Sequence, residues 1–148
     1  MNAAALAAPF PTVLMSTKAI EAARLLAGQN LPGVIVVDED GRPATVLPGT
    51  QVLLMAIPAY CVDDPTLARV VDEAAADVFL RGLRDRTVAD CLPGRRSELP
   101  VVPAEATVLE IAALMARARS PLVAVVDRHR RMLGAVTLDA LLDRLVIR

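Results

Sequence analysis

The 148-residue sequence predicts an α+β fold, an α/β-type sandwich in which two β-α-β-β-α units pack with pseudo-twofold symmetry. The first observation is an internal repeat. Residues 9–53 align with residues 98–142 at a constant offset of 89, without a gap, and 13 of the 45 aligned positions are identical. The second is the composition, with 55% hydrophobic but only 2% aromatic residues, so the core consists of Ala, Val and Leu. Because one repeat unit usually cannot bury its apolar face alone, the copies should share a seam where a ligand or partner binds.

The composition also limits the class of protein. The apolar content exceeds the usual value of roughly 45–50%, and we interpret the excess as surface buried in a homodimer. The longest uncharged apolar stretch, Val52–Val62, is interrupted by Pro58 and is shorter than the ~20 residues that a membrane span needs. Met1–Phe10 lacks the basic region of a signal peptide, so we expect a cytoplasmic protein without membrane insertion.

Two further classes are disfavoured. The net charge of −1 gives no field to attract nucleic acid, so we expect no nucleic-acid partner. Cys61 and Cys91 have neither metal-ligand spacing nor a disulfide framework, and we expect no metal site.

The second copy carries the clearer signals for each element. Leu99–Val102 predicts a strand. Thr107–Glu110 forms a capping box that begins a helix, and Ser120–Pro121 ends it, because the residue before proline avoids helical angles. The apolar run Leu122–Val126 is typical of a strand covered on both faces. The remaining expected elements are a turn at Asp127–Arg131, a strand at Met132–Val136 and a helix from about Leu138.

The first copy follows the same order with weaker signals. Lys18 occupies the capping position, so the helix cap must come from Ser16 or Thr17. Val34–Val37 predicts a strand, and Asp38–Gly41 a hairpin turn that is sharper than its counterpart, since Gly tolerates positive φ. The other expected elements are a short, irregular strand containing Pro43 and Pro48, and a helix near Thr50–Ile57.

We therefore divide the chain into a first repeat (1–57), an insert (58–97) and a second repeat (98–148). In the insert, Asp63–Pro65 predicts a helix start and Thr66–Leu83 the helix that follows. Thr87–Cys91 predicts a further short helical turn. The sequence leaves open whether the insert is a linker or a partner-facing extension.

The order of these motifs resembles the CBS domain pair, also called the Bateman module. The resemblance is carried by Pro121–Asp127 and Gly134–Thr137 in the second copy and by Leu31–Gly41 in the first. Thr87–Cys91 is similar to the short helical segment that precedes a CBS repeat. The resemblance implies a non-catalytic regulatory module that requires no cofactor, binds AMP, ADP, ATP or S-adenosylmethionine in an inter-repeat cleft, and controls an enzyme or transporter.

The family's nucleotide-binding pattern is only partly present. In that pattern a glycine is followed by a Ser or Thr that contacts phosphate, and then by an Asp or Asn that holds the ribose. The second copy has Gly134 and Thr137, but Ala140 stands in the acidic position, and Asp139 lies one residue early, rotated by about 100° on a helix. Losing a charge-assisted bond of about 1.5–3 kcal/mol weakens binding by roughly 10–100-fold. The corresponding residues of the first copy, Thr45, Pro48 and Gln51, match none of the pattern. The residues that the resemblance places in the ligand site are Thr137, Asp139, Gly134, Pro121, Leu122, Val123 and Val102.

Each candidate residue also has a structural explanation. Thr137 would cap the last helix, and Asp139 would favour the same helix through its dipole. Asp38 and Asp127 would accept backbone N–H bonds in the hairpin turns, with a ligand role as the alternative. Arg117 and Arg119 would neutralise phosphate. The cluster Arg128–Arg131 either binds phosphates or an acidic partner, or is simply solvated.

The sequence favours a binding module over an enzyme. His129, the only histidine, has no visible nucleophile or metal partner, and no nucleotide-hydrolase, dinucleotide or metalloprotease motif is present. The alternative function is a ligand-free module for dimerisation or partner docking. It rests on Ala140, Pro48 and Gln51, which make the nucleotide sites degenerate.

Overall fold

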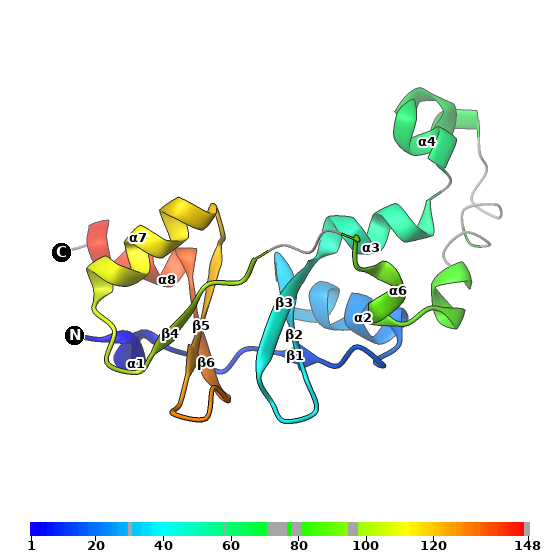
Figure 1. The fold of residues 1–148 in the computed structure, drawn as a ribbon. Coiled ribbons are helices and arrows are strands. Elements are labelled where there is room, and N and C mark those ends of the chain that lie inside the picture. The colour runs from blue at the N-terminus through cyan, green and yellow to red at the C-terminus, as the bar shows by residue number, and fades with distance from the viewer. Residues whose placement is uncertain (30, 58, 71–76, 78–80, 95–97, 147–148) are drawn as a thin grey trace. The chain divides into compact units, whose positions relative to one another are not determined.

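The computed structural model describes residues 1–29, 31–57, 59–70, 77, 81–94 and 98–146, and it contains two three-stranded sheets (Figure 1). Their strand orders are β1-β2-β3 and β4-β5-β6, which with the helices confirms the α+β class. The first repeat comprises β1 (Thr12–Val13), α2 (Ala19–Gln29), β2 (Gly33–Val37), β3 (Pro43–Pro48) and α3 (Gly49–Ala56). The second comprises β4 (Val101–Pro103), α7 (Val108–Ala118), β5 (Leu122–Val126), β6 (Met132–Thr137) and α8 (Leu138–Val146).

The repeat seen in the sequence is also a repeat of structure. At the offset of 89, the bounds of α2, β2 and β3 coincide with those of α7, β5 and β6. The prediction of a short third strand in the first repeat was wrong, because β3 has six residues, as β6 does. Pro43 and Pro48 are its first and last residues, positions where a missing N–H does not interrupt the ladder.

The start of α2 also differs from the prediction. The hydroxyl of Thr17 accepts a bond from the backbone N–H of Leu14 (2.9 Å) rather than from the helix. The first helical N–H, that of Ala19, donates to the carbonyl of Arg86 (2.9 Å). The backbone of the insert thus provides a hydrogen-bond acceptor for the N-terminus of α2.

The two hairpin turns are more alike than the sequence suggests. Gly41 has φ of +83° and Arg130, its counterpart, has φ of +65°. The second turn therefore uses the left-handed region although its residue has a side chain, which is unfavourable by about 1–2 kcal/mol.

The insert contains α4 (Ala59–Asp63), the 3₁₀-helices η1 (Pro65–Val70) and η2 (Gly82–Asp85), and α6 (Val88–Cys91). The helix start expected at Asp63–Pro65 is present, since Asp64 Oδ1 accepts bonds from both N–H and O–H of Thr66 (3.2 and 2.7 Å). The helix predicted for Thr66–Leu83 begins as the 3₁₀-helix η1. Residues 71–76 and 78–80 of that prediction lie outside the described residues.

The chain forms two compact units that do not coincide with the two repeats. The first unit contains the described parts of 1–12, 35–46 and 97–148, and the second those of 13–34 and 47–96. Each unit is considered by itself below.

Two short helices show why units and repeats differ. In the first unit, α1 (Ala3–Leu6) is held by bonds from the N–H groups of Ala3 and Ala4 to the carbonyls of Ala106 and Ala104 (2.8 and 2.9 Å). In the second unit, Val88 and Ala89 of α6 donate in the same way to Thr17 and Met15 (2.8 and 3.0 Å). The acceptors are again separated by 89 residues. The helix that precedes each repeat in the sequence is therefore bound by the other repeat.

The first unit buries both faces of the sheet β4-β5-β6. Helices α7 and α8 cover one face (Figure 1), where Val123 and Val125 of β5 pack against Ile111 and Leu141. On the opposite face, alternate β5 residues pack with two residues of β2; this cluster is Leu122, Ala124, Ala135, Leu99, Ile35 and Val37. This confirms that β5 is a strand covered on both sides.

Candidate functional site

Thr137 lies where β6 ends and α8 begins. Its Oγ1 accepts a bond from the backbone N–H of Ala140 (3.1 Å), so it caps the helix. The N–H of Leu138 donates to the carbonyl of Pro121 (2.9 Å), which fixes this helix end against the start of β5. A hydroxyl that accepts one bond still has its own proton to donate. Thr137 can therefore cap the helix and still donate its hydroxyl proton to a phosphate oxygen.

The two residues that follow in the nucleotide pattern lie in the first turn of α8. Asp139 is exposed, and Ala140 is half-buried with its N–H directed at Thr137. The methyl group of Ala140 thus occupies the position where the family pattern has a carboxylate.

Four other predicted residues belong to β4, β5 and the residue before β5. Leu122, Val123 and Val102 are at most 2% exposed, and their side chains pack in the core. Pro121 is exposed and follows Ser120, whose Oγ donates to the carbonyl of Leu122 (2.7 Å). These residues hold the strand in place, and only Pro121 presents its side chain at the surface.

Gly134 lies opposite the N-terminal segment. Ala8 and Ala135 exchange two backbone bonds, each of 3.0 Å, so residues around Ala8 run along the edge of β6. A Cβ atom on Gly134 would lie 2.8 Å from the carbonyl oxygen of Ala8 and 3.3 Å from the Cβ of Ala7. Glycine at this position therefore permits the close approach of the N-terminal segment.

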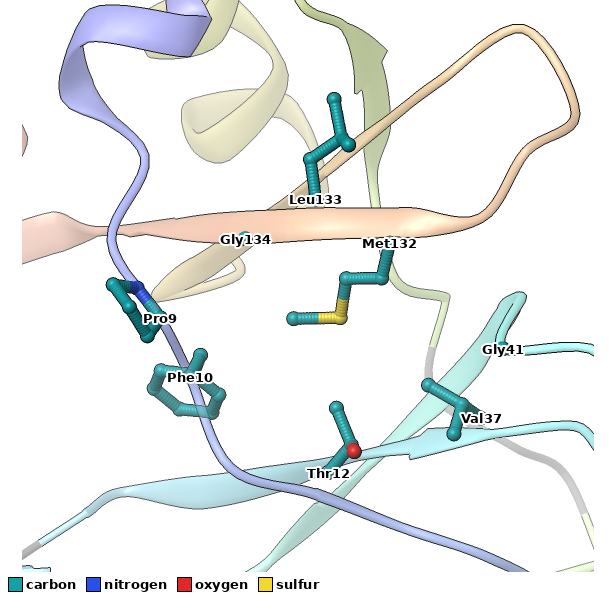
Figure 2. A pocket seen from close by; sticks show the side chains of 8 residues that line it. All are labelled: Pro9, Phe10, Thr12, Val37, Gly41, Met132, Leu133 and Gly134. Atoms are coloured by element: carbon teal, nitrogen blue, oxygen red, sulfur yellow. The ribbon is translucent and has the colours of Figure 1, made fainter.

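A pocket of about 340 Å³, here called the hairpin pocket, lies at the other end of β6, within the first unit. Figure 2 shows Met132 pointing from β6 toward Thr12 and Val37, with Phe10 at the side and Leu133 pointing away. Its lining residues are Pro9, Phe10, Thr12, Val37, Gly41, Met132, Leu133 and Gly134.

Gly134 is the only predicted site residue that lines this pocket. Sequence reasoning missed Pro9, Phe10, Thr12 and Met132 because they lie outside the segments that carry the family resemblance. The available signal was Phe10, one of only two phenylalanines in the chain.

The hairpin turns are held by their aspartates, as predicted. Asp38 Oδ1 accepts bonds from the N–H groups of Asp40 and Arg42 (2.9 Å each). Asp127 Oδ1 accepts from those of His129 and Arg131 (2.8 and 3.0 Å). The hydrogen bond from Arg131, supported by the one from His129, lowers the pKa of Asp127 below the usual aspartate value. Both acids thus have a structural role in the turns.

The basic residues near the turns and α7 are solvent-exposed. Arg42 Nε donates to the carbonyl of His129 (3.0 Å), which links the two hairpins. Arg119 ends α7 with φ of 51°, and Arg117 lies in the last turn of that helix. Neither Arg117 nor Arg119 lines the hairpin pocket.

A second hollow, the α7–α8 groove, has a volume of about 520 Å³. Leu138, Leu142 and Leu145 line it from α8 and are 40–51% exposed. The other lining residues are Ala112, Met115, Ala116, Arg119, Ser120, Pro121 and Leu141. This is an apolar surface on the helical side of the first unit.

Other chemistry finds little support in the described part of the chain. Within residues 1–29, 31–57, 59–70, 77, 81–94 and 98–146, His, Cys, Asp and Glu form no group that could hold a metal ion. Among the helices that the structure describes, none combines the length and the apolar character needed to cross a membrane. Cys61 and Cys91 are buried free thiols, and burial raises the pKa of Cys91.

Comparison with known proteins gives consistent results. The CBS domain family profile matches residues 4–46 and 88–147. A CBS domain-containing protein of unknown function from Kribbella flavida DSM 17836 is 49% identical, with a TM-score of 0.90 and 99% of each chain covered. No curated protein matches the sequence.

Two more distant structures share the fold. One is CBSX2 in complex with AMP, at 17% identity and a TM-score of 0.67, covering 99% of this chain and 96% of that one. The other is the cytosolic domain of the Mg²⁺ channel MgtE in complex with ATP, at 23% identity and a TM-score of 0.63. It is matched over 94% of this chain and 46% of its own.

Proposed function

The chain belongs to the CBS domain family, and on that premise we propose that it is a non-catalytic regulatory module that binds an adenine-containing ligand beside Thr137. The ligand is AMP, ADP, ATP or S-adenosylmethionine, and the module controls an enzyme or transporter in the cytoplasm. The proposed module consists of the repeats at 1–57 and 98–148, with residues 58–97 as an insert. Complexes of similar folds with AMP and ATP support the ligand class.

The observation that carries the proposal is the position of Thr137 at the N-terminus of the nine-residue helix α8. A helix N-terminus favours anions through its dipole and its unpaired N–H groups. The hydroxyl of Thr137 is fixed by its bond to Ala140 N–H, and its proton is left to donate to a phosphate oxygen. Phosphate would therefore meet a donor that is already oriented.

Binding should be weak in the natural sequence because Ala140 offers no carboxylate to the ribose. The variant Ala140→Asp tests this directly. We expect it to increase the affinity for AMP by roughly 10–100-fold, as one charge-assisted bond is gained. Ala140→Ser is the control, since it changes the size of the same side chain without adding a charge.

The phosphate contact is tested by Thr137→Asp. Aspartate is a good helix cap, so α8 should keep its stability, but its charge repels phosphate and nucleotide binding should be lost. The matched control is Thr107→Asp, because Thr107 caps α7 in the same way, accepting from Glu110 N–H (3.1 Å). Calorimetric titration with AMP and ATP measures both variants. Unchanged affinity in Thr137→Asp, or no gain in Ala140→Asp, would overturn the proposed site.

A ligand-free module for dimerisation or partner docking is the second candidate. Exposed leucines on α8 favour it, and Leu142 and its counterpart Leu53 are 45% and 53% exposed. In either case we propose a homodimer that buries the α7–α8 groove. Leu142→Glu should convert the dimer to a monomer in native mass spectrometry, whereas Leu133→Glu, at an exposed position of β6, should not. An intact dimer whose thermal unfolding is unaffected by all four adenosyl compounds would favour the second candidate.

A further inference from the structure

We propose that the hairpin pocket is a second binding site, separate from Thr137, for a small flat aromatic compound without a phosphate group. Gly134, Met132 and Leu133 line the pocket from β6, while Thr137 ends the same strand. At about 3.3 Å per residue, even Gly134, the lining residue of β6 nearest to Thr137, is roughly 10 Å from it. A ligand with a single ring system in the pocket would therefore not reach Thr137.

The walls of the pocket are fixed without a ligand. The N–H of Met132 donates to the carbonyl of Gly41 (3.0 Å), and Arg42 Nε donates to the carbonyl of His129 (3.0 Å), so the two hairpins are joined. The paired backbone bonds of Ala8 and Ala135 hold the third wall, which continues into Pro9 and Phe10. A pocket formed in advance binds without the entropy cost of ordering its walls.

The lining determines the chemistry of the ligand. Phe10, Val37 and Met132 offer a ring, a branched aliphatic group and a thioether, and the thioether makes favourable contacts with aromatic rings. Thr12 adds a hydroxyl to the lining, and its side chain extends toward Met132 (Figure 2). No charged side chain is among the eight lining residues, so the pocket does not favour a phosphate or carboxylate. A volume of about 340 Å³ is at the lower end for ligand pockets, roughly 300–1,000 Å³, and suits a single ring system.

Several residues that line the pocket differ in kind from their counterparts in the other repeat. At the offset of 89, Gly41 corresponds to Arg130 and Gly134 to Thr45. Phe10 and Thr12 correspond to Leu99 and Val101. The open space beside Gly41 and the pair of a ring and a hydroxyl are thus not general features of the repeat.

Methyl NMR tests this site directly. The full chain is labelled with [¹³C-methyl]methionine and titrated with indole, a flat aromatic compound with no phosphate. We expect a saturable shift of the Met132 methyl signal from the ring current, while Met115, which lines the α7–α8 groove, stays unchanged. The Met132→Leu variant assigns the signal.

Because Thr12 is exposed, variants at this position test binding without removing a side chain from the core. Thr12→Phe fills the pocket and should abolish the saturable shift, and Thr12→Val should weaken binding by about fivefold through loss of one hydrogen bond. Leu109→Ala is the control, since Leu109 of α7 is exposed and does not line the pocket, so binding should persist. Thr137→Asp should also leave the indole response intact. The proposal is overturned if Met132 shows no saturable shift, if Met115 shifts in parallel with it, or if Thr12→Phe binds indole normally.

Discussion

Replacing Gly134 with alanine tests whether the N-terminal segment is an integral part of the second sheet. The new Cβ would lie 2.8 Å from the carbonyl oxygen of Ala8, closer than real Cβ contacts allow, and that neighbour is backbone rather than a flexible side chain. Relief of the clash requires the N-terminal segment to move away from β6. Doing so breaks the two 3.0 Å bonds between Ala8 and Ala135.

The cost follows from these contacts. Two backbone hydrogen bonds contribute about 1 kcal/mol each, and overpacking costs about 1–3 kcal/mol where the bonds are kept instead. We therefore expect Gly134→Ala to lower the free energy of unfolding by about 2–3 kcal/mol. For a chain of this length, that corresponds to a fall in Tm of roughly 5–10 °C.

Thermal unfolding and amide hydrogen exchange without ligand measure the effect. The amides of Ala8 and Ala135 should exchange faster in Gly134→Ala, while those in the second unit stay protected. Gly28→Ala is the matched control. Gly28 lies in α2 with open space around it, so the same change should be neutral or stabilising by up to about 1 kcal/mol. An unchanged Tm and unchanged exchange at Ala8 would refute the structural role of Gly134.

Three further substitutions test local features. Arg130→Gly should raise stability by about 0.5–1 kcal/mol, measured by denaturant unfolding, because it removes a side chain from the left-handed region. Thr107→Ala should cost about 1 kcal/mol in the same assay through loss of the α7 cap, whereas Thr107→Ser should not. Asp127 has a lowered pKa in the fold, so its stabilising effect is present above the ordinary aspartate pKa of about 3.9 and is lost as pH falls through the lowered value. Asp127→Asn should therefore be less stable near neutral pH and lose less stability on acidification, and equal acid sensitivity of both proteins would contradict this.

Much of the fold could be predicted from the sequence, because local signals and the repeat agreed. The bounds of β5 were predicted correctly from its continuous apolar run, and the start of α7 from its capping box. The short helix at Thr87–Cys91 was also expected, and Thr87 and Asp90 form its reciprocal cap. These elements are determined by interactions between neighbours in the chain, which a sequence displays.

The errors occurred where distant backbone supplies the partner. At the start of α2, the N–H of Ala19 donates to the carbonyl of Arg86, and no side chain near Thr17 indicates this bond. The contact of Gly134 with Ala8 was also not foreseen, because it joins segments more than a hundred residues apart. The hairpin pocket likewise depends on the approach of Phe10 to β6, which no local motif encodes.

The exchange of the short helices explains why the repeat is not the folding unit. On one face of the second repeat's sheet, Ala3 of α1 packs in the core and is fully buried. On the other face, Ile35 and Val37 of β2 pack against the same sheet. Without residues 1–57, Leu122, Ala124 and Ala135 would lose these neighbours on one face, and Val136 and Val102 would lose Ala3 on the other. The second repeat thus buries its apolar surface only with segments of the first, so the chain should fold as a whole. A ligand in the hairpin pocket would therefore contact residues of both repeats, because Val37 and Gly41 belong to the first and Met132 to the second.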